Sequence, residues 1–308
     1  MKILTITLNP AFDMHCNIEK LQLYKENYVT SFVKHAGGKG INVSRALTGF
    51  DVENIAVCIL GDSGGQEFLR LLQEDSIHCN HIMTEGRIRE NITIHSCDKE
   101  TRISFEGFEI NKVIIDDLYE MVKSQQCDDF VVTFTGRLCK GISNAEAVEF
   151  LKKIKSLGAK LIVDCNSFTI EEITEISPYL IKPNEQEISQ LLGYEVEKED
   201  EAFVAAQKLC NLGIENVIVS LGSKGSVFCS QNSKLRIKVP EIVPVSTIGA
   251  GDSLIAGFVA GISSSRDITD TLKLAAAFGT AACLTQGTNP PRKSDIFDIK
   301  EKIMIERG

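Results

Sequence analysis

The sequence of 308 residues lacks tryptophan, contains only 6% aromatic residues and has no excess of positive charge. Its formal net charge of -9 argues against a nucleic-acid partner, because binding to a phosphate backbone requires a basic surface. No apolar run is long enough to span a bilayer, and the strand-like residues 1–10 do not have the form of a signal peptide. We therefore expect a cytoplasmic protein with neither a membrane nor a nucleic-acid partner.

Cysteine and histidine are present but do not cluster. The ten cysteines include no Cys-x-x-Cys pair, and the five histidines are dispersed along the chain. Neither pattern has the spacing of a zinc site or of a disulfide framework, so we expect reduced cysteines. No Ser-His-Asp or Cys-His order stands out, which argues against histidine-based nucleophilic catalysis. With 43% hydrophobic residues, the chain can still bury a sizeable core.

Strand-like and helix-like segments alternate along most of the sequence. Short apolar runs predict strands at 3–8, 55–60, 130–134, 160–163, 179–182 and 217–221. Apolar residues at helical spacing predict helices at 66–73, 113–123, 145–155, 185–192 and 201–212. This alternation predicts an α/β fold with a mainly parallel central sheet and helices on both faces. The charged tail, 292–308, is expected to be helical and superficial.

Two stretches, 11–34 and 89–106, break this alternation and look extended without a helical partner. Within the second, Asp98-Lys99-Glu100 predicts a turn between two short strands. We interpret both stretches as a small, discontinuous β layer inserted into one domain that spans 1–308. Such a layer could close over a ligand as a lid, form an oligomer interface, or do both.

The stretch 245–253 ends one element and starts an apolar helix. Gly249, Ala250 and Gly251 have almost no side chains, so an anion could approach their backbone amides at the positive end of that helix. Asp252 at this helix start is either a helix cap or a catalytic base beside the bound anion.

A second glycine-rich turn surrounds Lys39 and also precedes a helix. It is not a Walker loop, which needs Ser or Thr after Gly-Lys, and it lacks the third glycine of the dinucleotide fingerprint. Lys39 and Asn42 indicate a polyol or phosphate site, unless the glycines only form a structural turn. Asp13, which follows the first strand, either accepts hydrogen bonds from hydroxyls or starts a turn.

Two further motifs follow predicted strands. Asn184 and Glu187 lie three residues apart on one helical face, which suits a hydrated Mg²⁺ ion or, equally, an N-terminal capping box. The glycine-rich turn at 219–226 lies at the strand end where ligands bind in open α/β sheets. It could carry the phosphates of a nucleotide or form a hairpin turn.

In this order, the motifs resemble the ribokinase/PfkB family of sugar kinases, especially its branch of 1-phosphofructokinases and tagatose-6-phosphate kinases. The resemblance spans essentially the whole chain and is carried by Gly37-Gly38-Lys39-Gly40-Ile41-Asn42, Lys182-Pro183-Asn184-Glu185-Gln186-Glu187, Ser220-Leu221-Gly222 and Ser246-Thr247-Ile248-Gly249-Ala250-Gly251-Asp252. It implies a ribokinase-like fold with a small β-sheet lid. It also implies ATP- and Mg²⁺-dependent phosphorylation of a sugar phosphate, either fructose 1-phosphate or tagatose 6-phosphate.

The resemblance implies a role for each matched position. Asp252 would take the proton of the sugar hydroxyl, and Gly249, Ala250 and Gly251 would form the anion hole for the phosphoryl group. Asn184 and Glu187 would hold Mg²⁺ through water. The nucleotide site would comprise Lys182, Asn184, Glu187, Ser220, Gly222, Gly225 and Thr288. The sugar phosphate site would comprise Asp13, Gly37, Gly38, Lys39, Asn42, Arg89, Asn91 and Arg137.

Departures from the family pattern leave the identity of the sugar open. Thr135-Gly136-Arg137-Leu138-Cys139 stands where the family usually has Ser-Gly-Ser-Leu-Pro, and 164–167 replaces the usual Asp-x-Ser-Gly. A kinase of another sugar or nucleoside, or a non-catalytic sugar or nucleotide sensor, is the alternative. A nicotinamide-dependent dehydrogenase is disfavoured, since no strand is followed by a complete Gly-x-Gly-x-x-Gly with an acidic residue about 20 positions on.

Overall fold

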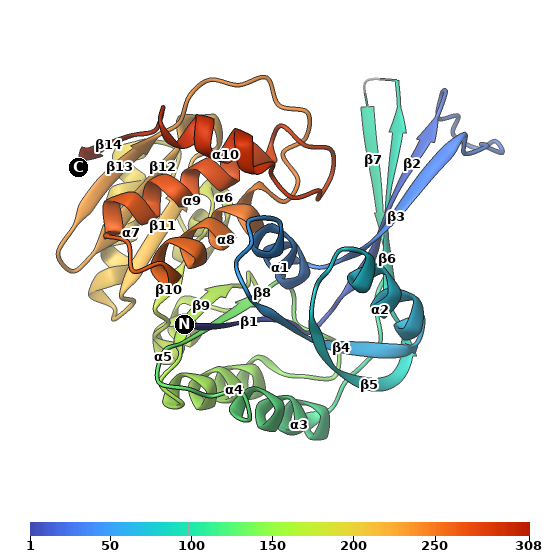
Figure 1. The fold of residues 1–308 in the computed structure, drawn as a ribbon, viewed down its shortest axis with the longest axis horizontal. Coiled ribbons are helices and arrows are strands. Elements are labelled where there is room, and N and C mark those ends of the chain that lie inside the picture. Colours follow the sequence, from blue (N-terminus) through green and yellow to red (C-terminus); the bar gives the residue numbers. More distant parts are fainter. Residues whose placement is uncertain (98) are drawn as a thin grey trace.

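The computed structural model describes residues 1–97 and 99–308 and contains two sheets (Figure 1). The large sheet has the strand order β14-β13-β12-β11-β10-β9-β8-β1-β4-β5. Its strands are β1 (Lys2–Thr7), β4 (Ile55–Ser63), β5 (Cys79–Arg87), β8 (Phe130–Thr135), β9 (Lys160–Asp164), β10 (Leu180–Ile181), β11 (Asn216–Ser220), β12 (Ser226–Ser230), β13 (Lys234–Lys238) and β14 (Met304–Arg307). Neighbouring strands run parallel from β5 across to β11, and antiparallel from β11 to β14.

Helices cover both faces of the large sheet, as the alternation predicts. They are α1 (Lys39–Gly49), α2 (Gly65–Glu74), α3 (Lys112–Lys123), α4 (Asn144–Ser156), α5 (Ile170–Ile176), α6 (Glu185–Leu192), α7 (Glu199–Asn211), the 3-10 turn η1 (Gly222–Lys224), α8 (Ala250–Ser263), α9 (Ile268–Ala282) and α10 (Lys293–Lys300). Two apolar cores result, one on each face. Consecutive strand residues contribute to different cores: Leu161 packs with α4 and α5, whereas Ile162 packs with α8 and α9.

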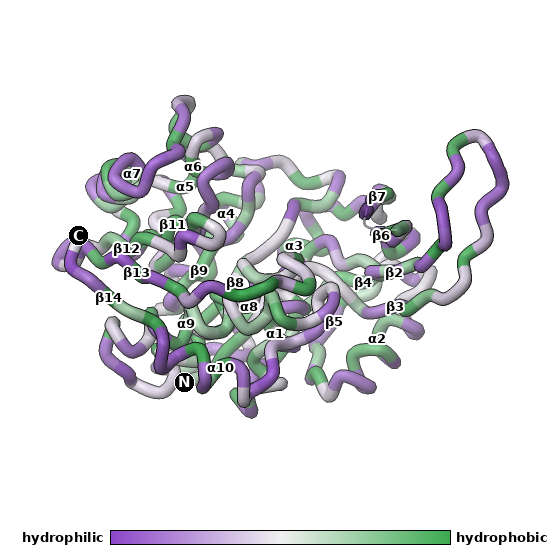
Figure 2. Tube along the Cα trace, turned by 90° about the horizontal axis from the view of Figure 1, so that it is seen from above, coloured by the Kyte–Doolittle hydropathy of each residue, from purple (hydrophilic) through white to green (hydrophobic). Residues whose placement is uncertain are grey.

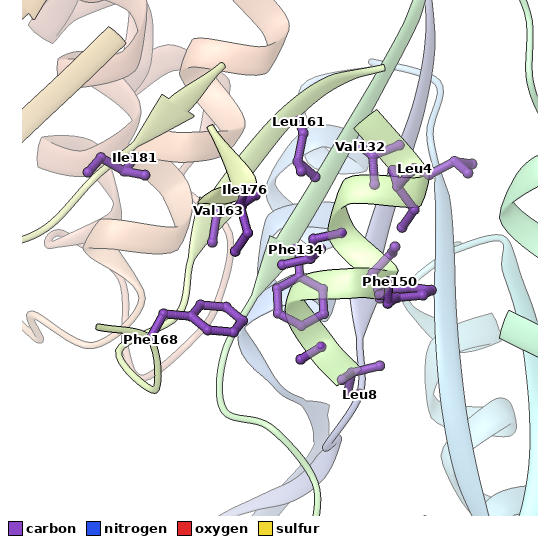
Figure 3. Packing of buried hydrophobic residues seen from close by; sticks show 14 of the residues in the cluster. Leu4, Leu8, Val132, Phe134, Phe150, Leu161, Val163, Phe168, Ile176 and Ile181 are labelled. Atoms are coloured by element: carbon purple, nitrogen blue, oxygen red, sulfur yellow. The ribbon is translucent and has the colours of Figure 1, made fainter. Parts of the chain in front are cut away.

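The first of these cores is aromatic near the carboxyl end of β8. Phe134 lies with its ring centroid 6.3 Å from that of Phe150 on α4 and 6.4 Å from that of Phe168 (Figure 3). All six residues of β8 are buried; four of them are apolar or aromatic and the other two are threonines. A strand that is buried on both faces cannot alternate polar and apolar residues, which explains its continuous apolar pattern.

The small sheet has the order β3-β2-β6-β7 and is formed by β2 (Ala11–Ile18), β3 (Ser31–Gly37), β6 (Arg89–Ser96) and β7 (Lys99–Ser104). β2 pairs antiparallel with β3 and parallel with β6, and β6 pairs antiparallel with β7. The two stretches predicted as an insert therefore lie side by side, and their strands leave the body of the molecule together (Figure 1). The loop between β2 and β3 projects beyond the rest of the chain (Figure 2).

Two details differ from the sequence-based expectations. The tail is only partly helical, because β14 follows α10 and pairs with β13, and it is fixed to the body by the buried side chains of Ile296, Ile299 and Ile303. Lys99 and Glu100 are not turn residues but the first two residues of β7, and Asp98 of the same predicted turn lies outside the described residues. The described ranges contain no helix that is long and apolar enough to cross a membrane.

Candidate active site

A cavity of about 640 Å³ lies between the small sheet and the carboxyl ends of the parallel strands. Ligands bind at this edge in open α/β sheets because the loops there leave a crevice at the strand ends. From the large sheet the lining includes Asp164 at the end of β9 and Ser220 at the end of β11. From the small sheet it includes Asp13 on β2 and Asn91 on β6, and the first turns of α1 and α8 complete it.

The first turn of α8 presents backbone amides to the cavity. Gly249 precedes the helix with φ 77°, a left-handed conformation that favours glycine, and it provides no side-chain cap. Within the described residues, the amides of Gly251 and Asp252 have no hydrogen-bond acceptor. A Cβ added to Gly251 would lie 3.1 Å from Nζ of Lys182, so the Lys182 ammonium lies close to this turn. The helix dipole, the two amides and the ammonium together can bind an anion.

Asp252 is the third residue of α8 and does not cap it. The cap interpretation is therefore wrong, and the side chain is instead directed into the cavity. Its Oδ2 accepts a hydrogen bond of 2.9 Å from Nδ2 of Asn42 on α1, and only 7% of the residue is exposed. Burial raises the pKa of Asp252 to about 6, although Lys39 and the Asn42 hydrogen bond act in the opposite direction. The group is thus ionised at neutral pH but basic enough to accept a proton.

A buried aspartate and two lysines form a charge network beside Asp252. Asp164 accepts a hydrogen bond of 2.9 Å from Nζ of Lys39 through Oδ2, and its Oδ1 lies 3.8 Å from Nζ of Lys182. Burial alone would raise the pKa of Asp164, but Lys182 and Lys39 outweigh it and lower that pKa. Burial likewise opposes the charge on Lys39, yet Asp164 and Asp252 raise its pKa. Lys39 therefore stays charged.

Polar side chains that suit a hydroxylated ligand lie on the small sheet. Nδ2 of Asn91 donates to Oδ1 of Asp13 at 2.8 Å, and Nη1 of Arg89 donates to Oδ1 of Asn91 at 3.2 Å. Burial and the nearby Arg137 lower the pKa of Arg89, against the effect of Asp13. Arg89 is then a cation with few water contacts, which strengthens its attraction for a phosphate.

The glycines before α1 allow the backbone to approach these groups. A Cβ on Gly37 would overlap the carboxylate of Asp13, and one on Gly38 would lie 2.8 Å from Cγ2 of Thr7. Gly38 also has φ 119°, a conformation that other residues rarely adopt. Both glycines are therefore required for the turn that places Lys39 and Asp13 at one cavity.

The nucleotide-site candidates divide into two groups. Asn184 and Glu187 line the cavity and also form a capping box, with Oδ1 of Asn184 accepting from the Glu187 amide at 2.8 Å. Ser220 and Thr288 line the cavity as well. Gly222 and Gly225 do not: they belong to the hairpin between β11 and β12, where the Gly225 carbonyl accepts from the amide of Leu221 at 2.8 Å.

Sequence reasoning missed several residues that line the cavity. They are His15, Ile92, Thr93, Arg102, Ser104, Asp164, Thr247 and Ile248. A signal existed for Asp164, because it directly follows a buried apolar strand. For Thr93, Arg102 and Ser104 the signal is the strand register, since Asn91 pairs with Ser104 and Thr93 with Arg102 on the same face. This register cannot be predicted from the sequence until it is known which strands pair.

Known proteins with the same pattern identify the class of enzyme. The sequence pattern described as pfkB family carbohydrate kinase matches residues 8–295. The chain belongs to this family and is a carbohydrate kinase. This explains a cavity that combines a helix start for an anion with side chains for hydroxyl groups.

The similarity to individual known proteins extends over almost the whole chain. A 1-phosphofructokinase of Haemophilus influenzae is 29% identical over 98% of this chain and 97% of its own length. A tagatose-6-phosphate kinase of Staphylococcus epidermidis is 32% identical over 98% of this chain and 100% of its own. Among solved structures, phosphofructokinase-2 from Escherichia coli in complex with potassium superposes with a TM-score of 0.91 at 25% identity, covering 98% of each chain.

The buried charge of Asp252 leads to a prediction about stability. Because its pKa in the folded protein is raised from 3.8 to about 6, the group stabilises the fold at low pH and this contribution is lost as pH rises through 6. The neutral side chain of Asp252→Asn does not ionise and so does not lose stability in this way. The free energy of unfolding of Asp252→Asn, relative to that of the wild type, should therefore increase by about 1 to 1.5 kcal/mol between pH 5 and pH 7.5. Urea unfolding at both pH values measures it.

Asp298→Asn, on the exposed side of α10, is the matched control and should change stability by less than about 0.5 kcal/mol at either pH. An advantage of Asp252→Asn that is the same at pH 5 and pH 7.5 would contradict the raised pKa.

Proposed function

We propose that this carbohydrate kinase transfers the γ-phosphoryl group of ATP to a hydroxyl of a sugar phosphate, with fructose 1-phosphate and tagatose 6-phosphate as the first candidates. The observation that carries the proposal is the position of Asp252, a buried carboxylate in the first turn of a helix whose free amides face the same cavity. In this proposal one kinase domain spans 1–308, and the small sheet acts as its lid.

The residues around Asp252 match the needs of phosphoryl transfer. That reaction depends on alignment and on neutralising the charge of the transferred group, more than on covalent help. Asp252 would accept the proton of the attacking hydroxyl. The amides of Gly251 and Asp252, with the backbone of Gly249 and Ala250 and the ammonium of Lys182, would stabilise the phosphoryl group. Lys39 would stay protonated beside Asp252, since Asp164 holds it.

Asn184 and Glu187 are the residues that would hold Mg²⁺, through water. Their oxygen atoms belong to the ligand class that Mg²⁺ prefers, and one capping oxygen of Glu187 leaves the other oxygen of its carboxylate for a metal-bound water. The described residues include no cluster of three or more metal-ligating side chains, so the ion would depend on the nucleotide phosphates for further ligands. When bound, Mg²⁺ supplies charge neutralisation at those phosphates.

A phosphate already present on the sugar would bind at the other end of the cavity. Arg89, Arg102 and Arg137 line this region, while Asp13, Asn42 and Asn91 offer hydrogen bonds to hydroxyls. Three guanidinium groups exceed the requirement of a neutral sugar, and they suit a phosphate dianion. The names of the two similar kinases, which act on phosphorylated ketohexoses, support the same substrate class.

The substrate class can be tested by measuring ADP release with free and phosphorylated hexoses, ribose and a nucleoside. We expect the highest kcat/KM with a ketohexose phosphate. Asp252→Asn should lower kcat about 10²- to 10⁴-fold with little change in ATP affinity, because the amide cannot accept the proton. In the wild type, kcat should fall about tenfold per pH unit below pH 6, where Asp252 becomes protonated.

Each other outcome of this assay has a definite meaning. The highest activity on ribose or a nucleoside would replace the sugar phosphate with another substrate of the family. ATP binding without turnover on any compound would favour a non-catalytic sensor. Near-normal turnover of Asp252→Asn would remove Asp252 as the base.

Arg89 is expected to bind the phosphate of the substrate. Arg89→Ala should raise KM for the phosphorylated sugar about 10- to 100-fold and change KM for the unphosphorylated sugar less than about threefold, because only the former loses a charged hydrogen bond. Steady-state kinetics with both sugars measure the difference. Arg87→Ala is the matched control, since Arg87 is exposed and pairs with Glu90 outside the cavity lining. Equal effects of Arg89→Ala on both sugars would contradict this role.

We also propose that the small sheet joins two copies of the chain in a homodimer. Exposed large hydrophobic side chains gather on it and on the β2–β3 loop, namely Leu23, Tyr24, Tyr28, Val29, Phe32, Val33, Ile103 and Phe105. Such a concentration is unusual on a free surface, and β3 and β7 are edge strands of this sheet.

Sedimentation velocity tests the dimer. The wild type should sediment as a dimer, and Phe32→Asp should shift it to a monomer by placing a charge in the apolar interface. Val113→Asp changes an equally exposed hydrophobic residue on α3 and should leave the dimer intact. A monomeric wild type, or loss of the dimer in both variants, would contradict the interface.

A further inference from the structure

Arg45 is a buried cation that the proposed reaction does not use directly. It lies one turn after Asn42 on α1 and is only 5% exposed. Arginine is rarely buried unless its donors are satisfied, because removing its charge from water is costly. A residue that only packed α1 against the sheet would be better served by an apolar side chain. The contacts of this guanidinium group therefore indicate the role of Arg45.

The guanidinium group of Arg45 donates hydrogen bonds to acceptors on three different residues. Nε and Nη2 approach Oδ2 of Asp75 at 3.0 Å and 2.9 Å, just after the end of α2. Nη2 also donates to the backbone carbonyl of Ala36, beside the glycine turn. Nη1 donates to Oδ1 of Asn42 at 3.0 Å. Asp75 and Ala36 thus hold the guanidinium in place from two other segments of the chain.

The contact with Asn42 determines which way its amide faces. A guanidinium has donors and no acceptor, so it can bind only the oxygen end of an amide. With that oxygen facing Arg45, the NH₂ group of Asn42 must face Asp252, where Nδ2 lies 2.9 Å from Oδ2. The reversed amide would place an oxygen against the carboxylate. Oδ2 of Asp252 is thereby engaged, and Oδ1 is left to accept the proton of the substrate.

We propose that Arg45 is a positioning residue of the phosphoryl transfer: it fixes the amide of Asn42, which in turn holds the carboxylate of Asp252 in its proton-accepting orientation. Hydrogen bonds connect Asp75 to Arg45, Arg45 to Asn42 and Asn42 to Asp252, and they link the end of α2 to the candidate base. The proposal rests on the function proposed above. It concerns a residue outside the cavity lining, which no motif of the sequence indicated.

Other charged groups near this chain are accounted for. Asp252 faces Lys39 from α1, Asp164 from β9 and Lys182 from the segment after β10. Arg45 faces Asp75, and also lies near His35 on β3, whose pKa is lowered by burial and by Arg45. Arg45 contacts none of Lys39, Lys182 and Asp164, so its replacement removes no contact of that network. A change in Asp252 would then report on Asn42.

A double-mutant cycle tests the proposal. Arg45→Met removes the donor while keeping an apolar side chain of similar length, and should lower kcat about 10- to 100-fold with KM for ATP changed less than about threefold. Asn42→Ala removes the amide that Arg45 orients. In that background Arg45→Met should have almost no further effect on kcat. Arg70→Met, which breaks an exposed ion pair on α2, is the control for loss of an arginine and should leave kcat unchanged.

Two results would overturn the proposal: an unchanged kcat in Arg45→Met, or the same fold-loss in the wild-type and Asn42→Ala backgrounds. Equal losses would show that Arg45 acts independently of Asn42, for example through the fold alone. Should Arg45→Met not fold, as judged by circular dichroism, Arg45→Lys enters the same cycle. Its loss of kcat must likewise vanish in the Asn42→Ala background, and a loss that persists there counts against the proposal.

A measurement without substrate separates this proposal from the proposed function. The carboxyl ¹³C resonance of Asp252, assigned with Asp252→Asn, reports its pKa in the free protein. Arg45→Met should raise that pKa, because the hydrogen bond from Asn42 that lowers it is lost or reversed. An unchanged pKa would overturn the positioning role even if the kinase assay succeeds. A raised pKa with no turnover on any sugar would instead leave the positioning intact and count against the function.

Discussion

A carboxylate that must be charged inside a nearly closed environment is the constraint on which the rest of this site depends. Asp252 is buried, and burial opposes its ionisation. The surroundings compensate only in part: Asn42 donates one hydrogen bond and Lys39 contributes a positive charge at a distance. A fully compensated carboxylate would be a poor proton acceptor, and an uncompensated one would be neutral. The arrangement lies between these limits, which is what a general base at neutral pH requires.

Opposite charges also stabilise one another among the groups next to Asp252. Asp164 contacts both Lys39 and Lys182, at 2.9 Å and 3.8 Å, and it raises the pKa of Lys39. These three side chains come from α1, β9 and the segment after β10, and Lys39 lies 125 positions before Asp164 in the sequence. The parallel sheet brings them together because its strands all end at one edge. The fold thus supplies the geometry, and the buried charges make that geometry specific.

Sequence patterns predicted the helices and strands of this fold better than the contacts between their side chains. The continuous apolar runs of β8 and β11 and the glycine turns before α1 and α8 were legible because each follows a local rule of burial or backbone conformation. The contacts of Arg45 with Asp75 and of Lys39 with Asp164 were not, because these partners lie 30 and 125 positions apart in the sequence. The tail was misjudged for the same reason: β14 is a short, mostly exposed strand whose only sign is the pairing with β13.

One feature of the cavity gives it a direction. Arg89 and Arg102 line the cavity from the small sheet, whereas the buried carboxylate of Asp252 lines it from α8. A molecule with a phosphate at one end and hydroxyls along its length can then enter in only one orientation. Under the proposed function, the reactive hydroxyl would be chosen by its separation from that phosphate, and the cavity would work as a molecular ruler. Two sugars that differ in the stereochemistry of a middle carbon, but not in length, would both satisfy such a ruler.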